Sequence, residues 1–409
     1  MERQYKKIVC AYSGGLDTSV MIPWLRERYG AEIVTYTGDL GQGEDLPGIR
    51  QKALNTGASV AVVDDLRQRF VDEFIWPAVR ASALYEGLYP LHTALGRPLI
   101  AARLVEVARE HGADAVAHGC TGKGNDQVRF EVTIRALAPE LEIVAPLRTW
   151  ELDTREAEVD YAMARGIPIP VTRERPYSID KNLWGCAIEC GEMEDLWTEP
   201  PDDAWIMTKD PAHAPKGSVE IMLSFEQGIP VAIDGRAMNG VALITYLNDL
   251  AGQFGVGRID MVENRVVGLK SREVYEAPAA TLIHMAHTEL ERIALDRETF
   301  HYARKISQDY ANLIYNGSWF GPLKSCLDGF IAESQRPVTG DIRIRISAGL
   351  ARITARRSAY SLYDKGLATY SEGNTFDPAS ATGFLDLYTL PFRTVAAVRR
   401  RAKMAEGKR

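Results

Sequence analysis

The sequence predicts an α/β protein, with a doubly wound parallel sheet in its first part and an α+β arrangement in its second. Over the first part, short apolar runs alternate with helical patterns, which is typical of a parallel sheet covered on both faces. A glycine-rich stretch follows the first apolar run directly. Later in the chain, apolar and polar residues alternate one by one, which indicates antiparallel hairpins.

The first part is expected to contain five buried strands and two clear helices. The helix that begins near Thr18 is expected to end at Gly30 and to be bent by Pro23. The expected strands are 6–12, 31–39, 58–64, 114–119 and 141–146, and the helices are 18–30 and 99–113. Ligands of such sheets bind beyond the carboxyl ends of the strands, where the stretches 11–19 and 118–126 lie.

The pattern of apolar and polar residues changes after a proline-rich stretch, 166–172, which is expected to be a linker. Hairpins are expected at 218–235, around Gly228, and at 341–356. Helices are expected at 239–255 and 301–315. The predicted domains are 1–166, a nucleotide-binding domain, then 172–360, and a C-terminal arm at 361–409.

Composition excludes several classes of protein. The net charge is −7, with 55 acidic against 48 basic residues, which argues against a nucleic-acid surface apart from the basic C-terminal end. No stretch approaches the ~20 apolar residues of a membrane span, and the charged start has no apolar signal core behind it. A cytoplasmic protein without nucleic-acid or membrane partners is therefore expected. The 5 cysteines are scattered, so reduced thiols are expected.

A metal site is not expected. His284 and His287 are close enough to share a helix face, but the sequence marks no further ligand beside them.

The stretch AYSGGLDTS, residues 11–19, is expected to hold phosphate. A glycine-rich turn before a helix presents free N–H groups and the positive end of the helix dipole, and both favour an anion. Ser13, Thr18 and Ser19 can donate hydroxyl hydrogen bonds. Asp17 suits an anion site only if it faces a cation, which Mg²⁺ bound to the phosphates would provide.

Two common phosphate motifs do not fit. The Walker pattern fails around Gly122 and Lys123, because its first glycine falls on Ala117 and Gly124 follows the lysine. The dinucleotide pattern fails at Gly14, because Leu16 takes the place of its second glycine. The stretch does fit S-G-G-x-D-[ST], the loop of ATP pyrophosphatases, which cleave ATP between the α and β phosphates. The alternative is a turn that merely needs glycine.

Four further stretches resemble one family within that superfamily. They are ALYEGLYPL (83–91), GCTGKGNDQVRFE (119–131), YSIDKNLWG (177–185) and GVGRIDMVENRVVGLKSREVYEAP (255–278). With AYSGGLDTS they are similar to argininosuccinate synthases, in the family's order and spacing, from about residue 6 to about residue 390. The resemblance implies an adenine nucleotide alpha hydrolase-like domain, a synthetase domain and a homotetramer in which the C-terminal arm reaches a neighbouring subunit.

The resemblance also implies a reaction, part of arginine biosynthesis. The ureido oxygen of citrulline attacks the α-phosphate of ATP, giving citrullyl-AMP and pyrophosphate, and the amine of aspartate then displaces AMP. ATP and Mg²⁺ are the implied cofactors. Holding the substrates in line contributes on the order of 7–11 kcal/mol to such a step. No residue stands out as the general base, so a phosphate oxygen of the leaving AMP is a candidate proton acceptor.

The family's site residues carry over by motif. Asp17, Asp126 and Arg129 are the expected catalytic residues. The expected ATP contacts are Ala11, Tyr12, Ser13, Gly14, Gly15, Leu16, Asp17, Thr18, Ser19, Gly38 and Gly119. The expected aspartate contacts are Thr121, Asn125 and Asp126. The expected citrulline contacts are Tyr89, Thr93, Asn125, Arg129, Ser178, Ala187, Glu263 and Tyr275. Arg129 suits a carboxylate clamp, and Glu263 suits an ammonium group.

Four positions depart from the family's patterns. Ala94 and Ala187 stand where one form of the family has serines that contact citrulline, and Thr93 is a candidate to replace the first of them. His92 is unusual, and Cys186 stands where arginine or a polar residue is expected. These changes bear on citrulline recognition and leave the ATP chemistry untouched.

Two other functions remain open from the residues. A related ATP pyrophosphatase could adenylate another ureido, amide or nucleobase oxygen, although tRNA-modifying members need basic surfaces and often reactive cysteine pairs. A non-catalytic nucleotide sensor would not need the aspartate and citrulline motifs. Release of pyrophosphate that depends on citrulline distinguishes the enzyme from the sensor.

Overall fold

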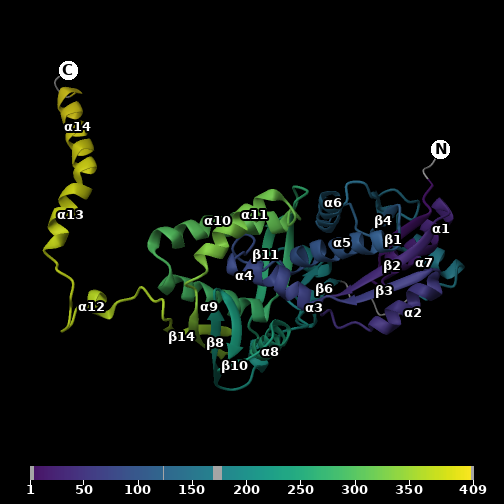
Figure 1. Ribbon diagram of the computed structural model, residues 1–409, viewed down its shortest axis with the longest axis horizontal. Coiled ribbons are helices and arrows are strands. Elements are labelled where there is room, and N and C mark those ends of the chain that lie inside the picture. The colour runs from purple at the N-terminus through teal and green to yellow at the C-terminus, as the bar shows by residue number, and fades with distance from the viewer. Residues whose placement is uncertain (1–3, 123, 169–176, 407–409) are drawn as a thin grey trace. The chain divides into compact units, whose positions relative to one another are not determined.

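The computed structural model describes residues 4–122, 124–168 and 177–406. By its internal contacts the chain divides into two compact units, residues 1–360 and 361–409 (Figure 1).

A five-stranded parallel sheet in the order β3-β2-β1-β4-β5 forms the centre of the first part (Figure 1). Its strands are β1 Lys7–Ala11, β2 Glu32–Asp39, β3 Val60–Asp65, β4 Ala115–Ala117 and β5 Glu142–Val144. All five strands predicted from the apolar runs are present. Side chains of β1 are buried on both faces, since Ile8 and Cys10 join one core cluster and Val9 joins another.

Helices cover both faces of this sheet, as the doubly wound prediction requires. The helices α1 Leu16–Tyr29, α2 Leu46–Thr56 and α7 Arg155–Ala164 pack together and share the core cluster of Ile8 and Cys10. The helices α5 His92–Glu110 and α6 Asp126–Leu137 pack on each other and share the cluster of Val9. Strand β1 pairs with both β2 and β4. Strands β2 and β3 are therefore added on one side of β1, and β4 and β5 on the other, so the strand order reverses between β1 and β4. A ligand site is therefore expected at the loops after β1 and β4.

The predicted helix 99–113 begins earlier than expected. Its first residue is His92, and Leu91 before it has a φ of 67°, in the left-handed region. Pro98 lies inside the helix. The extra turns carry Thr93 and Arg97 toward the carboxyl ends of the strands, so this early start positions part of the site.

Two antiparallel sheets follow in the second part. The first, in the order β10-β9-β8-β13-β14, consists of β8 Ser218–Glu226, β9 Ile229–Ile233, β10 Arg236–Ala237, β13 Gly340–Ser347 and β14 Leu350–Arg357. It contains both predicted hairpins. The second, in the order β11-β12-β7-β6, consists of β6 Ser178–Asn182, β7 Gly185–Glu189, β11 Arg258–Asn264 and β12 Lys270–Glu276. This sheet was not predicted.

Four longer helices accompany these sheets: α8 Gly240–Gln253, α9 Pro278–Ala294, α10 Arg297–Tyr315 and α11 Pro322–Ser334. Helices α8 and α9 pack with the sheets, and α10 packs with α11 and α5. Helices α8 and α10 confirm the two helices predicted here. The predicted linker 166–172 lies partly outside the described residues. His284 and His287 lie on α9 and are buried, and the described residues contain no group of three or more His, Cys, Asp or Glu able to hold a metal ion.

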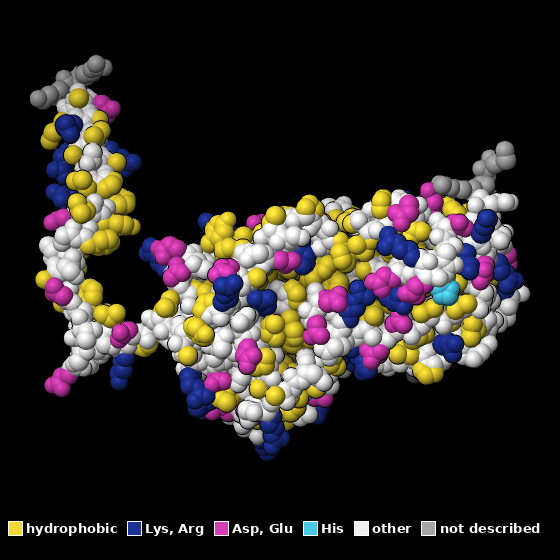
Figure 2. Space-filling model, viewed as in Figure 1, with side chains coloured by type: hydrophobic (Ala, Val, Ile, Leu, Met, Phe, Trp, Pro, Cys, Tyr) yellow, Lys and Arg dark blue, Asp and Glu magenta, His cyan; other side chains and the backbone are white. Residues whose placement is uncertain are grey.

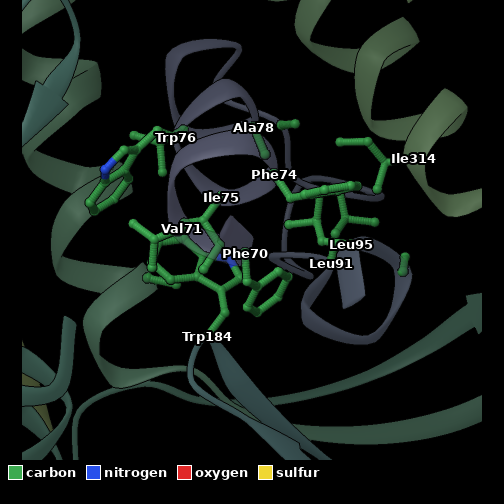
Figure 3. Packing of buried hydrophobic residues seen from close by; sticks show 14 of the residues in the cluster. Phe70, Val71, Phe74, Ile75, Trp76, Ala78, Leu91, Leu95, Trp184 and Ile314 are labelled. Carbon is green, nitrogen blue, oxygen red and sulfur yellow. The ribbon is translucent and has the colours of Figure 1, made fainter. Parts of the chain in front are cut away.

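The largest core cluster joins the parallel sheet to the second part. A continuous helical segment consists of α3 Arg67–Phe70, a π-helical turn Val71–Ile75 and α4 Trp76–Arg80. Phe70, Phe74 and Ile75 of this segment are fully buried around Trp184 and Ile314 (Figure 3). Apolar burial stabilises by roughly 25 cal/mol per Å², so this shared core holds the two parts in one unit.

The second unit contains α12 Lys365–Ala368, α13 Ser380–Tyr388 and α14 Leu390–Glu406. Hydrophobic side chains are exposed along α13 and α14 (Figure 2). None of the helices in the described ranges is both long and apolar enough to cross a bilayer.

Candidate active site

A cavity of about 1280 Å³ opens where the carboxyl ends of the parallel strands meet the second antiparallel sheet. One wall consists of the loops after β1, β2 and β4. The other consists of side chains from β6, β7, β11 and β12. The cavity therefore lies at the position that the strand order predicts.

The glycine-rich loop after β1 forms one end of this cavity. Ser13, Gly14, Gly15 and Thr18 line it, together with Ala11 and Tyr12. Gly14 has a φ of 79°, in the region that favours glycine. The Ser13 and Thr18 hydroxyls lie 3.1 Å apart, and Ser13 Oγ accepts from the Gly15 N–H at 3.3 Å. Backbone and hydroxyl groups at the start of α1 thus face the cavity, an arrangement suited to phosphate.

Three residues of the predicted stretch do not line the cavity. Leu16 packs beside a core cluster, and Ser19 is buried, donating to the Gly15 carbonyl at 2.6 Å. Asp17 interacts with Glu158 of α7. Burial, together with the nearby Asp17 carboxyl, raises the pKa of Glu158 to about 8, so Glu158 is largely protonated at neutral pH.

The position of Asp17 affects whether the glycine-rich loop can bind Mg²⁺. Mg²⁺ in nucleotide sites is usually held by one or two carboxylates together with phosphate oxygens. Asp17, the expected partner, interacts with Glu158 and is not part of the cavity wall. The described residues therefore do not fit a preformed magnesium cage at the glycine-rich loop.

Two predicted glycines line the cavity where little space is left. A Cβ on Gly38 would lie 2.9 Å from Leu66 Cδ1 and 3.1 Å from the Tyr36 hydroxyl. A Cβ on Gly119 would lie 3.1 Å from Thr18 Cγ2. Both positions exclude larger residues because of packing, and the absent side chains keep the backbone accessible to a ligand.

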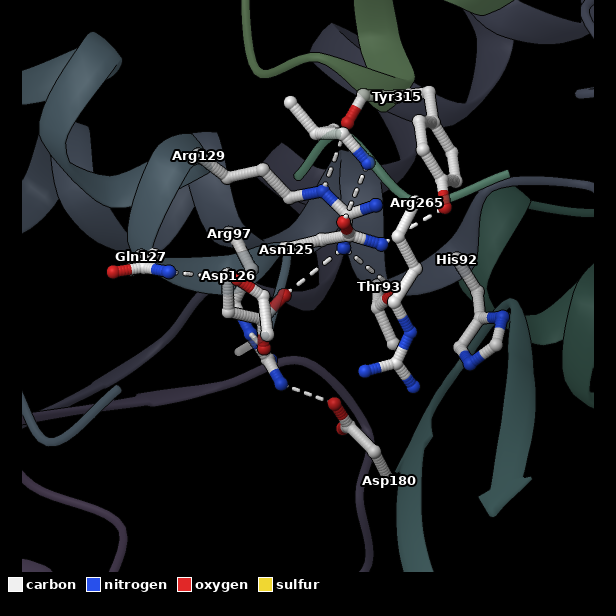
Figure 4. Close-up of polar contacts among 12 residues, drawn as sticks. His92, Thr93, Arg97, Asn125, Asp126, Gln127, Arg129, Asp180, Arg265 and Tyr315 are labelled. Carbon is white, nitrogen blue, oxygen red and sulfur yellow. Dashed lines mark hydrogen bonds and ion pairs between the residues drawn. The ribbon is translucent and has the colours of Figure 1, made fainter. Parts of the chain in front are cut away.

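Four charged side chains that line the cavity form a cluster (Figure 4). Arg97 donates through Nε to Asp126 at 2.7 Å and through Nη2 to Asp180. Arg129 donates through Nη1 to the other oxygen of Asp126 at 2.9 Å. The two guanidiniums and two carboxylates balance formally, so each charge is compensated inside the protein.

The electrostatics of Asp126 follow from this cluster. Burial raises the pKa of Asp126, but the charges of Arg97 and Arg129 lower it by more, and the pKa lies below its usual range. Arg129 is 3% exposed, and its Nε donates to the Tyr315 carbonyl at 3.1 Å. Among the described residues, Nη2 of Arg129 has no hydrogen-bond partner, which leaves a donor available for a ligand oxygen.

A second polar group surrounds Glu263, which is 2% exposed. Its carboxylate accepts from the Tyr275 hydroxyl at 2.6 Å and from the Tyr315 hydroxyl. The Tyr315 hydroxyl also accepts from Asn125 Nδ2 at 2.8 Å, while Asn125 Oδ1 accepts from the Val266 N–H at 3.0 Å. Burial raises the pKa of Glu263 above its usual range. The group fixes the orientation of both Asn125 and Glu263.

The aromatic wall between these groups consists of stacked tyrosines. Tyr89 and Tyr275 stack with ring centroids 4.1 Å apart and planes 6° apart. The Tyr89 hydroxyl lies 2.6 Å from Thr93 Oγ1, which in turn accepts from Arg129 Nη1 at 3.4 Å. Of the predicted citrulline contacts, all except Ser178 line the cavity. Ser178 is exposed at the start of β6.

The four departures from the family's patterns lie in different places. Ala187 lines the cavity, opposite Tyr275 in the pairing of β7 with β12. Ala94 and Cys186 are fully buried, and neither lines the cavity. His92 is buried beside Tyr89 and Tyr275 and does not line the cavity, and burial lowers its pKa to about 3. Only Ala187 therefore changes the cavity surface.

The structure also adds cavity residues that sequence reasoning missed, among them Arg97, Asp180 and Arg265. Arg97 lies four residues after Thr93, so both occupy one face of α5, and this spacing was the available signal. Asp180 lies inside the stretch 177–185 that carried the family resemblance. Arg265 donates to Glu273 at 2.7 Å and also to Glu189. Burial, and next the neighbouring Glu189 carboxylate, raise the pKa of Glu273 to about 7.

Comparisons with known proteins give one answer over both parts of the chain. The family model described as the arginosuccinate synthase N-terminal HUP domain matches residues 7–168, and the arginosuccinate synthase C-terminal domain matches residues 177–395. The chain is 52% identical to an argininosuccinate synthase of Chlorobium luteolum, covering 97% of this chain and 99% of the relative. It is 55% identical to the argininosuccinate synthase of Chlorobaculum tepidum, covering 95% of this chain and 97% of the relative.

Proposed function

The chain belongs to the argininosuccinate synthase family of ATP-dependent ligases, which join citrulline to aspartate, and we propose how its cavity carries out that reaction. The observation that carries the proposal is a single cavity with an N–H-rich loop at one end and paired acidic and basic groups at the other. The loop suits a polyphosphate, and the paired groups suit zwitterionic amino acids.

In the first half-reaction, the ureido oxygen of citrulline attacks the α-phosphorus of ATP. The bond between this phosphorus and the bridging oxygen breaks, pyrophosphate leaves, and citrullyl-AMP forms. Arg129 presents its open Nη2 donor to the citrulline carboxylate, and Glu263 accepts the citrulline ammonium. The N–H group of Gly14 and the hydroxyls of Ser13 and Thr18 hold the phosphates while negative charge moves onto the leaving group.

In the second half-reaction, the amine of aspartate attacks the activated ureido carbon. The bound ammonium first gives one proton to solvent and so becomes the attacking amine. The carbon–oxygen bond to AMP breaks, and the nitrogen loses a second proton to a phosphate oxygen of the leaving AMP. Thr121, Asn125 and Asp126 hold aspartate. Asp126 already accepts from two guanidiniums, and a carboxylate has about four lone-pair sites, so it retains capacity for the aspartate ammonium.

Magnesium, when bound, would enter with the triphosphate and neutralise part of its charge. The described residues offer no carboxylate cage for it at the loop, so we assign no protein ligand. The loop's own contribution is hydrogen bonding through Ser13, Thr18 and the backbone.

We further propose a homotetramer in the cytoplasm, with domains at 1–166 and 172–360 and an arm at 361–409. Support for the arm comes from its exposed side chains. Phe384, Tyr388 and Phe392 recur every four residues, and each is more than half exposed. An apolar stripe at helical spacing is suited to a partner surface.

Pyrophosphate release tests the proposal. ATP and Mg²⁺ are supplied with citrulline and aspartate, singly and together. Release that requires citrulline, followed by argininosuccinate once aspartate is added, is the expected result. ATP binding without citrulline-dependent release would favour a nucleotide sensor or a different acceptor.

A further inference from the structure

Lys52 occupies a position in the cavity that neither the predicted site nor the proposed reaction uses. It lies on α2 and lines the cavity with Gly48 and Ile49 of the same helix. Its Nζ donates to the carbonyl of Gly14 at 2.6 Å. A Cβ on Gly14 would lie 3.2 Å from Ile49 Cγ1, so α2 packs directly against the glycine-rich loop.

The charge of Lys52 is not neutralised within the described part of the chain. Among the cavity's cations, Arg97 and Arg129 pair with Asp126, and Arg265 pairs with Glu189 and Glu273. Lys52 has no carboxylate within salt-bridge distance there, and the same is true of Lys181 on β6. Burial lowers the pKa of Lys52, which indicates an ammonium partly removed from water. An anion beside it would relieve that cost.

The position of α2 indicates which anion this is. Helix α2 packs beside α1, on one face of the parallel sheet, whereas Arg129 and Thr93 come from α6 and α5 on the other face. In an in-line transfer, the leaving group lies opposite the attacking oxygen. Citrulline at Arg129 therefore directs the pyrophosphate toward the glycine-rich loop and α2.

We propose that Lys52 binds the β- and γ-phosphates of ATP and stabilises pyrophosphate as it leaves, an inference that rests on the proposed adenylation reaction. The bond between the α-phosphorus and the bridging oxygen breaks, and its electron pair stays on pyrophosphate. The Lys52 ammonium neutralises part of this charge and transfers no proton. The Gly14 carbonyl holds the ammonium in place before the nucleotide arrives.

Binding measurements separate this role from a structural one. Calorimetric titrations without citrulline give the Kd values of ATP, pyrophosphate and AMP. For Lys52→Met, we expect the Kd of ATP and of pyrophosphate to rise about tenfold or more, as for the loss of one charge-assisted hydrogen bond. The Kd of AMP is expected to stay within about twofold, because AMP lacks the β- and γ-phosphates.

Three further variants complete the test. Lys52→Gln keeps a hydrogen-bond donor for the Gly14 carbonyl but loses the charge, so it is expected to behave like Lys52→Met. Lys52→Arg keeps the charge and is expected to retain most of the affinity for ATP. Arg50→Met is the matched control, because Arg50 lies on α2, is exposed and donates to the Ala61 carbonyl rather than lining the cavity.

Two results would overturn the inference. An equal loss of ATP and AMP affinity in Lys52→Met, restored by Lys52→Gln, would mean that Lys52 only supports the loop. Unchanged affinity for ATP and pyrophosphate would mean that it contacts no phosphate. Failure of the reaction itself is recognised separately, because the unmodified protein would then release no pyrophosphate when citrulline is added.

Discussion

At the scale of single residues, we propose that the charged cluster decides how the cavity distinguishes its substrates. Asp126 accepts from Arg97 and from Arg129, while Asp180 forms an ion pair with Arg97 alone among the residues that the structure describes. Removing one partner of a buried charge pair leaves the other uncompensated, which is costly. Because Asp126 and Asp180 have different neighbours, the same substitution at each of them tests which carboxylate binds aspartate.

Asp126→Asn is expected to weaken aspartate binding selectively. The amide removes the charge that faces the aspartate ammonium, so the KM for aspartate should rise about tenfold or more. Citrulline-dependent pyrophosphate release should change by less than about threefold. Steady-state kinetics of both half-reactions give these numbers. Asp180→Asn is the control, because it also removes a negative charge beside Arg97 but leaves the pair of Asp126 with Arg129 intact. An equal rise in the KM for aspartate in Asp180→Asn would contradict the assignment of Asp126 to aspartate binding.

The pair formed by Asp17 and Glu158 predicts a dependence of stability on pH. The pKa of Glu158 is about 8 in the folded protein, above the ~4.3 of an unfolded chain. Between these values the folded state binds a proton that the unfolded state does not, so stability falls as the pH rises through this window.

Glu158→Gln removes this titration. The variant and the unmodified protein should unfold at the same temperature at pH 4. At pH 8.5 the variant should be more stable by roughly 2 °C, since solvent screening reduces the effect. Differential scanning calorimetry at both pH values measures this. Glu156→Gln, at an exposed position in the same turn of α7, is the control. A Tm difference independent of pH would refute the raised pKa of Glu158.

Some site residues could be predicted and others could not, for a physical reason. Asn125, Asp126, Arg129, Glu263 and Tyr275 lie in stretches that the sequence marks, and all of them line the cavity. Arg265 lies in a marked stretch as well, but nothing in the sequence shows which carboxylates it meets. Its partner Glu189 comes from another strand, and only the pairing of β7 with β12 brings Glu189 beside Glu273.

At the scale of elements, the turn between β1 and α1 contains a glycine, Gly14, that has a left-handed backbone and also packs against α2. Gly14 and Gly30 both have positive φ values, 79° and 65°, and flank the same helix. A Cβ on Gly14 would meet Ile49, whereas a Cβ on Gly30 would have no heavy atom within 4 Å.

Gly14→Ala and Gly30→Ala are therefore expected to share a loss of stability of about 1–2 kcal/mol from the left-handed backbone. Only Gly14→Ala should weaken ATP binding, by about tenfold or more, because Gly14 lines the cavity. Chemical denaturation and ATP titration measure the two effects. Unchanged ATP affinity in Gly14→Ala would exclude the loop as the phosphate site.

The elements of the parallel sheet were easier to predict than those of the second antiparallel sheet. Strands buried on both faces show continuous apolar runs, as in β1. The strands β6, β7, β11 and β12 instead direct polar side chains such as Asp180, Glu189 and Glu273 into the cavity. In these strands, polar residues that line the cavity stand at positions where a half-buried strand usually has apolar ones. The alternation of apolar and polar residues that would have predicted the strands is therefore lost.

At the scale of the whole molecule, the C-terminal arm is expected to determine assembly. Phe392→Asp places a charge in the apolar stripe of α14 and should shift the protein from the proposed tetramer to smaller species in sedimentation velocity. Arg401→Asp is the control, because Arg401 lies on the opposite face of α14 from Phe392. Sedimentation of Phe392→Asp identical to that of the unmodified protein would contradict the proposed role of the arm.

The central claim is that the ureido oxygen of citrulline attacks ATP within this cavity. It is tested most directly by citrulline labelled with ¹⁸O in the ureido group, supplied with ATP, Mg²⁺ and aspartate, and by mass spectrometry of the products. The account predicts one ¹⁸O atom in the phosphate of AMP and none in pyrophosphate or argininosuccinate, because that oxygen bonds to the α-phosphorus and leaves with it. Label in pyrophosphate, or AMP without label, would contradict the account.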